Sequence, residues 1–279
     1  MAKRPNSVRN LDAAIRRYSS MHGMPYVETR TLIVNALVAQ MLPDGVIKGG
    51  SAMKVRYGNE GTRFTKDLDT ATSLSIKEYQ QQLAHSLAIG WEGFTGTIVK
   101  NQPPSPDGVP EEYVMQPFSI KMLYLEKPWC TVPLEVGPNE IGDADEGVRF
   151  EQIEASRVME ELGFPSLGDA NLMPISYQVA QKLHGLTGPG DRVRDLIDLQ
   201  LIANNEDLDY SEINRVCKRL FAYRGEQPWP PYVVPNFGWE RIYRQLAEGL
   251  PVFENLSDAV AWANDLILLI KDHEPQNRE

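Results

Sequence analysis

The chain has 279 residues, of which 42% are hydrophobic and 24% charged, and its formal net charge is −10 at pH 7. These values are ordinary for a soluble globular protein with one large or two modest domains. The acidic balance argues against a protein that holds nucleic acid by bulk charge attraction. No apolar run is long enough to span a bilayer, and residues 1–6 lack the apolar core of a secretory signal. We therefore expect a cytoplasmic protein that has no membrane partner.

The first part of the chain interleaves helices and strands. Apolar residues at helical spacing indicate the helices, and short β-compatible runs indicate the strands. Alternating residues over 118–124 and 130–136, separated by Lys127-Pro128, predict a β-hairpin. Before the hairpin we expect, in chain order, helices over 8–20 and 26–42, a strand over 46–48, a helix over 51–57, a strand over 66–71 and a helix over 76–89.

After about residue 150 the pattern is mostly helical. Helices are predicted over 176–186, 192–203, 210–222, 239–247 and 257–270, with Ser257 as the N-cap of the last. The predicted fold class is therefore an α/β (α+β) core with a mixed sheet, followed by a helical C-terminal domain. We place the first domain at 1–160 and the second at 161–279.

The most informative stretch begins at Gly49-Gly50-Ser51 and continues to Asp67 and Asp69. Glycines allow close backbone approach, and a helix that starts here offers its first N–H groups to a phosphate. Residues i and i+2 of a strand share a face, so Asp67 and Asp69 are expected to project together. Such a pair suits a hard divalent cation such as Mg²⁺, with Mn²⁺ as an alternative. A phosphate cradle beside metal carboxylates predicts nucleotidyl transfer.

A two-metal transfer site normally needs about three carboxylates. Glu135 is the best candidate for the third, because it lies on the opposite strand face from Val132, Leu134 and Val136. A charged residue on that face is also what a plain exposed strand would show. The metal ligands expected from the sequence are therefore Asp67, Asp69 and Glu135.

A second charged cluster lies in the helical part. Its members are Lys182, Arg192, Arg194, Asp195 and Asp198. Asp195 and Asp198 are three residues apart and share a helix face. The cationic members could grip a triphosphate, and a carboxylate could orient them or activate the acceptor hydroxyl. The alternatives are a charge cluster at a helix start, or an Asp195 that pairs with Arg192.

Five basic residues also surround the glycine motif. They are Lys48, Lys54, Arg56, Arg63 and Lys66, and we expect most of them to be solvated surface charges.

These segments resemble the AbiEii-type nucleotidyltransferase toxins, a family of the DNA polymerase β-like superfamily. The resemblance rests on Lys48–Gly58, on Arg63–Asp69, on Lys182, and on the basic-x-basic-Asp-x-x-Asp segment from Arg192 to Asp198. Both basic positions of that last segment are Arg where the family often has Lys. The resemblance implies a nucleotidyltransferase core, an NTP substrate, catalytic roles for Asp67, Asp69, Lys182, Asp195 and Asp198, and a cognate antitoxin. Nucleotide binding would then fall to Gly49, Gly50, Ser51, Lys182, Arg192 and Arg194.

The resemblance also implies an RNA acceptor. Characterised relatives add nucleotides to the acceptor end of transfer RNA, which blocks translation, and no residue of this chain specifies that substrate. Transfer to a small molecule or a protein side chain is an alternative, which the acidic net charge mildly favours. A non-catalytic nucleotide-binding module is a third hypothesis, and the intact Asp67/Asp69 pair argues against it.

Overall fold

The computed structural model describes residues 3–104, 114–188 and 190–274. The chain separates into two compact units. Unit 1 comprises Met1–Asn59 and Phe64–Met173, and unit 2 comprises Glu60–Arg63 and Pro174–Glu279. The domain boundary expected at residue 160 falls near the end of a helix of unit 1. Unit 1 itself continues to Met173. Within the described ranges, no helix is long and apolar enough to cross a membrane.

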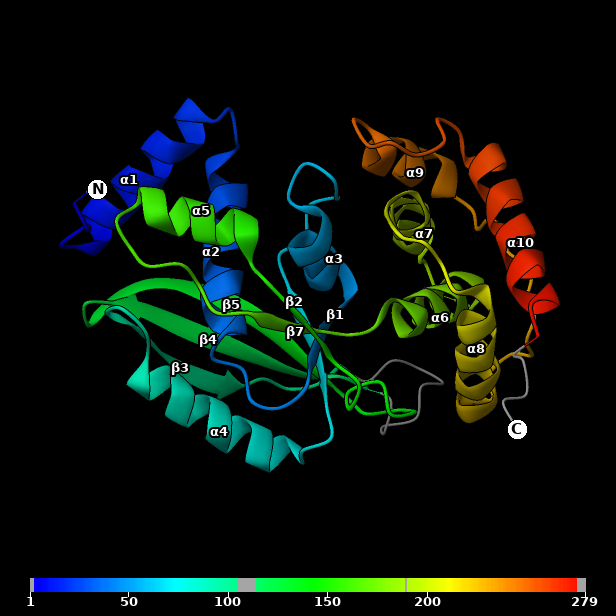
Figure 1. Cartoon of the computed structure of the whole chain (residues 1–279), viewed down its shortest axis with the longest axis horizontal. Coiled ribbons are helices and arrows are strands. Elements are labelled where there is room, and N and C mark those ends of the chain that lie inside the picture. Colours follow the sequence, from blue (N-terminus) through cyan, green and yellow to red (C-terminus); the bar gives the residue numbers. More distant parts are fainter. Residues whose placement is uncertain (1–2, 105–113, 189, 275–279) are drawn as a thin grey trace. The chain divides into compact units, whose positions relative to one another are not determined.

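Unit 1 is built on a mixed seven-stranded sheet with the strand order β3-β4-β5-β2-β1-β7-β6 (Figure 1). The predicted strands β1 and β2 and the predicted hairpin β4–β5 are confirmed, whereas β3, β6 and β7 were not predicted. The strands are β1 Val46–Lys48, β2 Leu68–Thr72, β3 Phe94–Lys100, β4 Gln116–Tyr124, β5 Lys127–Pro138, β6 Val148–Phe150 and β7 Ala170–Leu172.

The hairpin turns two residues earlier than its sequence suggests. Tyr124 pairs with Lys127, so the connection is Leu125-Glu126 and not Lys127-Pro128. Both turn residues have positive φ, at 47° and 61°, which matches the twist of a tight two-residue hairpin. Because neither residue is Gly or Asn, the sequence carries no signal for this turn.

Strand β2 holds the centre of the sheet, antiparallel to β1 and parallel to β5. Paired residues of neighbouring strands project from the same face. One face carries the buried row Ile47, Thr70 and Val136 and belongs to the core. The other face carries the row Lys48, Asp69 and Glu135.

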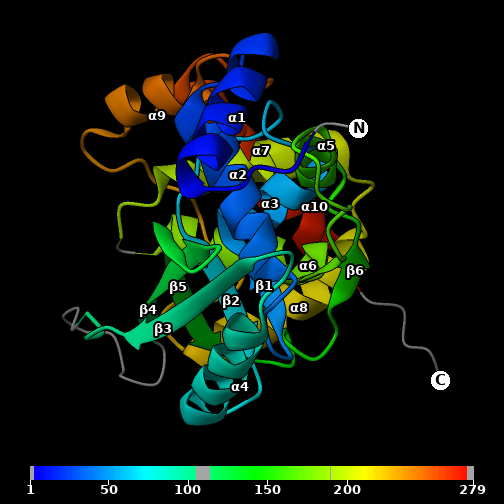
Figure 2. The same ribbon diagram turned by 90° about the vertical axis from the view of Figure 1, so that its left-hand side faces the viewer.

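The helices of unit 1 pack on the core face of the sheet. Tyr79 of one helix lies within hydrogen-bonding distance of Thr70 (3.3 Å between hydroxyl oxygens). The buried apolar residues of another helix belong to the hydrophobic core that covers this face. Figure 2 shows α4 beside the edge strand β3, against which it packs. These helices are α1 Val8–Met21, α2 Tyr26–Ala39, α3 Gly49–Tyr57, α4 Ile76–Ile89 and α5 Ile153–Glu161, of which α5 was not predicted.

Unit 2 is helical, as expected, and its five described helices all match predicted ones. The last helix begins at Leu256 with Asn255 as its N-cap, whose side chain accepts a hydrogen bond from the Asp258 N–H. The prediction that Ser257 caps this helix is therefore wrong. The helices are α6 Ile175–Thr187, α7 Val193–Asn205, α8 Tyr210–Arg224, α9 Trp239–Ala247 and α10 Leu256–Asp272.

Candidate active site

The sheet of unit 1 presents two carboxylates side by side. Asp69 of β2 pairs directly with Glu135 of β5. Both side chains are partly buried. Asp67 lies one residue before β2 and is exposed. Because Asp67 lies outside β2, the prediction that Asp67 and Asp69 share one face of a strand does not hold for Asp67.

Helix α3 begins at Gly49, two residues before the predicted start, and its N-terminus lies beside Asp69. Gly49 has φ +61°, a left-handed conformation that residues with a Cβ rarely adopt, and a Cβ here would collide with Asp69 Oδ2. A Cβ at Gly50 would lie 3.1 Å from that of Thr65. The glycine pair thus lets the first turn of the helix approach the carboxylate and the segment that leads into β2.

Ser51 fixes this arrangement from the other side of the first turn. Its side chain is buried, and its hydroxyl donates a hydrogen bond of 2.5 Å to the carbonyl oxygen of Asp67. The hydroxyl thereby joins the start of α3 to the residue before β2. A contribution of Ser51 to phosphate binding would come from its backbone N–H at the helix start.

The donor set on this face fits a magnesium ion. Mg²⁺ is usually held by one or two carboxylates together with substrate phosphates and water. Asp69 and Glu135, paired in register, supply the two carboxylates. Within the described ranges, no three His, Cys, Asp or Glu side chains form a group that could hold a metal ion. A metal on this face would therefore share its coordination with the phosphates of a bound nucleotide.

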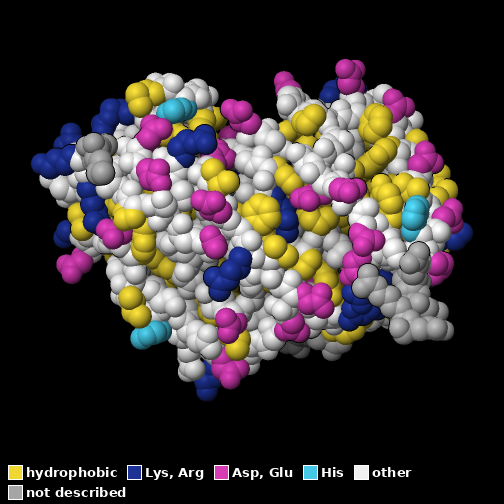
Figure 3. Space-filling model, viewed as in Figure 1, with side chains coloured by type: hydrophobic (Ala, Val, Ile, Leu, Met, Phe, Trp, Pro, Cys, Tyr) yellow, Lys and Arg dark blue, Asp and Glu magenta, His cyan; other side chains and the backbone are white. Residues whose placement is uncertain are grey.

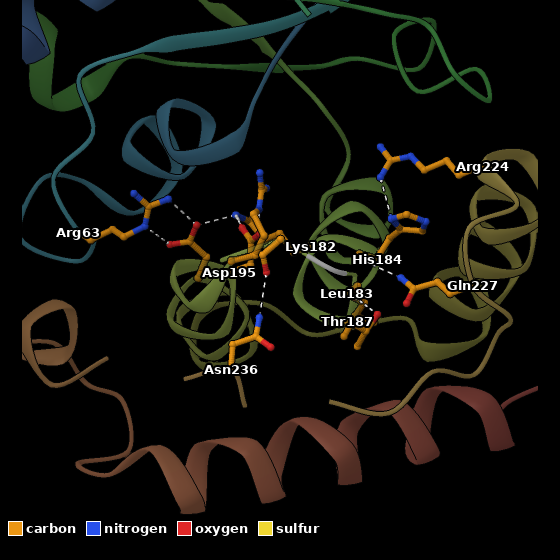
Figure 4. Close-up of polar contacts among 12 residues, drawn as sticks. Arg63, Lys182, Leu183, His184, Thr187, Asp195, Arg224, Gln227 and Asn236 are labelled. Atoms are coloured by element: carbon orange, nitrogen blue, oxygen red, sulfur yellow. Dashed lines mark hydrogen bonds and ion pairs between the residues drawn. The ribbon is translucent and has the colours of Figure 1, made fainter. Parts of the chain in front are cut away.

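Unit 2 gathers most of the second charged cluster into one buried network (Figure 4). The Lys182 ammonium donates to Asp198 Oδ2 at 2.5 Å and to Asp195 Oδ1 at 3.2 Å. Arg192 contacts the second oxygen of Asp195 at 2.7 Å. The Arg63 guanidinium grips both oxygens of Asp198, each at 2.9 Å. Arg194, in contrast, is exposed on α7 and lies outside this network.

The charge balance of the network keeps Asp198 ionised. Burial alone would raise the pKa of Asp198, but the Lys182 ammonium and the Arg63 guanidinium outweigh it and hold that pKa below its usual range. A carboxylate with a lowered pKa is a weak proton acceptor. The geometry therefore suits Asp198 to orienting Lys182 and Arg63 rather than to activating a hydroxyl.

Beside Lys182 on α6, the imidazole of His184 is buried. Burial, together with the positive charge of Arg224, lowers its pKa to about 4, so the ring is neutral at pH 7. Its Nδ1 lies 3.1 Å from an Arg224 Nη1 atom, and its ring packs edge-on against Phe221. These contacts are those of a packing residue.

Three of the five basic residues around the glycine motif are not solvated charges, contrary to the prediction. Lys54 is buried and donates to Asn59 Oδ1 at 2.6 Å. Arg56 donates to the carbonyl oxygen of Met173 at 2.9 Å. Arg63 is bound to Asp198, so it contributes to the candidate site although the sequence analysis did not place it there. The only sequence signal for Arg63 was its place in the family pattern.

The comparisons with known proteins concern the family and the fold. A family model described as "Nucleotidyl transferase AbiEii toxin, Type IV TA system" matches residues 33–270. The chain belongs to the AbiEii nucleotidyltransferase toxin family. It is thus a nucleotidyltransferase toxin of a type IV toxin–antitoxin system. No curated protein matches the sequence.

Solved structures share the fold of this AbiEii-family chain. MenT4, a nucleotidyltransferase toxin from Mycobacterium tuberculosis H37Rv, is 17% identical with a TM-score of 0.53, over 94% of this chain and 99% of MenT4. The "putative nucleotidyltransferase from H. pylori" is 16% identical over 88% of this chain and 94% of its own, with a TM-score of 0.44. The likeness to MenT4 shows the fold.

The contact between Gly49 and Asp69 predicts a specific cost for a Cβ at this position. Gly49→Ala should destabilise the AbiEii-family enzyme by more than the roughly 1–2 kcal/mol that a left-handed non-glycine residue costs. Gly23→Ala is the matched control, because Gly23 has φ +67° and a Cβ there would meet nothing within 4 Å. Urea unfolding measures both losses. Equal losses would show that Asp69 does not pack against Gly49.

The buried network predicts a loss of stability when Asp198 is neutralised. Asp198→Asn leaves Lys182 and Arg63 without their shared counter-charge and should cost about 3–5 kcal/mol at pH 7. Arg194→Ala, on the exposed side of the same helix, should change the free energy of unfolding by less than about 0.5 kcal/mol.

The same network predicts how the free energy of unfolding depends on pH. Because the folded-state pKa of Asp198 is lowered, its contribution is complete above the unfolded value of ~3.9 and is lost as pH falls through the folded value. The stability gap between wild type and Asp198→Asn should therefore be constant from pH 7 to about pH 5 and shrink below about pH 4. Unfolding curves over this range measure the gap, and a gap that closes already near pH 6 would contradict the assignment.

Proposed function

We propose that this toxin transfers a nucleoside monophosphate from an NTP to RNA, at the 3′ end of transfer RNA, and thereby blocks translation in the cytoplasm. The observation that carries the proposal is the in-register pair Asp69 and Glu135 beside the glycine start of α3. The pair offers oxygen ligands for Mg²⁺, and the helix start offers N–H groups for phosphates. The cognate antitoxin is the protein partner that the family implies.

In the proposed reaction, the acceptor hydroxyl oxygen attacks the α-phosphorus of the NTP. The bond between that phosphorus and the α–β bridging oxygen breaks, the electron pair leaves on pyrophosphate, and the hydroxyl proton passes to solvent. Bound Mg²⁺ would offset the charge that develops on the phosphate oxygens. Asp69 and Glu135 would hold the ion, with Asp67 as a further ligand once the nucleotide is bound.

In the proposed reaction, residues of unit 2 would supply positive charge for the nucleotide. Lys182 would contact the triphosphate, because an ammonium has three donors and the carboxylates of Asp195 and Asp198 occupy two of them. Asp195 and Asp198 would set the position of that ammonium. Arg192 and Arg194 would add positive charge for the nucleotide, Arg194 from an exposed position on α7.

Support for an RNA acceptor comes from the surface of α1. Lys and Arg side chains gather over this helix in Figure 3. Arg9, Arg16 and Arg17 are the exposed basic residues of α1. A local cationic surface of this kind can bind phosphates despite a net charge of −10. The alternative acceptors, a small molecule or a protein side chain, would not need it.

The labelling experiment that tests the proposal uses purified toxin, Mg²⁺, each labelled NTP in turn, and total cellular RNA or total protein. We expect one NTP to label transfer RNA at its 3′ end, and EDTA to abolish the labelling. Asp69→Asn should reduce transfer by about 100-fold or more, because it removes a charge that acts on the reacting phosphates. Asp265→Asn, a neutralised exposed carboxylate on α10, serves as the control and should leave transfer unchanged.

Two outcomes would contradict this assignment. Label that appears in protein and never in RNA would favour the alternative acceptor. Undiminished transfer by a folded Asp69→Asn variant would show that the Asp69 and Glu135 pair has no part in the mechanism.

A further inference from the structure

Lys48 is a cation on the carboxylate face of the sheet. It pairs with Asp69 across β1 and β2, and Asp69 pairs with Glu135 across β2 and β5. The three residues thus form one row, and their side chains project from the same face. Lys48 is one of the five basic residues of which most were expected to be solvated, and it is partly buried.

The Lys48 side chain extends from β1 across β2 to β5. A Cβ built on Gly137 of β5 would lie 2.9 Å from Lys48 Nζ and 3.6 Å from its Cε. Gly137 pairs with Ala71, so the two strand positions beneath this path carry the smallest side chains. The absence of a side chain at Gly137 therefore leaves room for the ammonium, one step along β5 from the face position of Glu135.

The charges around this ammonium leave it available to an anion. Asp69 and Glu135 lie directly opposite each other, an arrangement that is destabilising for like charges. A cation close to the pair offsets that repulsion. Among the described residues, however, the Lys48 ammonium makes no ion pair and no side-chain hydrogen bond, so its donors are available to a phosphate.

We propose that Lys48 binds the terminal phosphates of the NTP and holds the pyrophosphate that leaves. This inference rests on the proposed function, because the pyrophosphate that Lys48 would hold is the leaving group of the proposed transfer. The Lys48 ammonium lies beside the carboxylates that would hold the metal, and its residue immediately precedes the first turn of α3. The metal, the helix start and the ammonium would thus all contact the polyphosphate, and Gly137 leaves room for the ammonium.

The test measures binding of magnesium pyrophosphate by calorimetry, independently of transfer. Lys48→Ala should weaken binding by about 10- to 100-fold, the range for a lost hydrogen bond to a charged group. Lys48→Arg should recover part of the affinity, and Lys48→Gln provides a second neutral variant if Lys48→Ala does not fold. Lys121→Ala removes an exposed cation from the same sheet face and should bind like wild type. In transfer assays, Lys48→Ala should raise the KM for NTP.

A double-mutant cycle with Gly137→Ala tests the path of the side chain. The added methyl group should displace the ammonium and weaken pyrophosphate binding in the wild-type background. In the Lys48→Ala background, the same change should have no further effect. Independent, additive losses would overturn the role given to Gly137.

The outcomes separate this inference from the proposed function. Wild-type pyrophosphate affinity in folded Lys48→Ala would overturn the inference, whatever the transfer activity. Transfer to no macromolecule, combined with pyrophosphate binding that depends on Lys48, would overturn the proposed function and support the inference. A Lys48→Ala variant that loses affinity for Mg²⁺ but not for pyrophosphate would reduce Lys48 to a counter-charge of the carboxylates and would also overturn the inference.

Discussion

The candidate site of unit 1 depends on the two-sided pairing of β2. Its antiparallel register with β1 places Lys48 beside Asp69, and its parallel register with β5 places Glu135 on the other side. A shift of one residue in either register would turn a member of this row toward the core. The buried partners Ile47, Thr70 and Val136 oppose such a shift, because they would have to leave the core face. Apolar burial on one face thus fixes the charged geometry on the other.

The two charged sets of the molecule differ in how their charges are compensated. In unit 2, Asp195 and Asp198 are almost fully buried and are matched by Lys182, Arg192 and Arg63. Buried charges persist only when they are paired in this way. Asp69 and Glu135 on the sheet of unit 1 are only partly buried and occupy paired positions of neighbouring strands. The unit 2 network is therefore preorganised by matched charges.

Local signals predicted most of the fold and part of the site. Helical periodicity identified α1, α4 and the helices of unit 2, and the alternation around Leu134 correctly placed Glu135 away from the core. Strand β3 was missed because its Gly96 interrupts the pattern, and the short strands β6 and β7 of three residues each carry too little pattern to be recognised. The buried contacts of Arg63 and Arg56 were missed because their partners are distant in sequence, at Asp198 and Met173.

The path of the chain between α3 and β2 has a consequence for how this protein can fold. Residues Glu60–Arg63 belong to unit 2, although the chain on both sides belongs to unit 1. Arg63 is made early in synthesis, but its partner Asp198 lies 135 positions later. Arg63 therefore cannot make its contact with Asp198 until α7 has been synthesised. A ribosome-bound N-terminal fragment would carry Lys48, Asp69 and Glu135 while Arg63 still lacks its partner on α7.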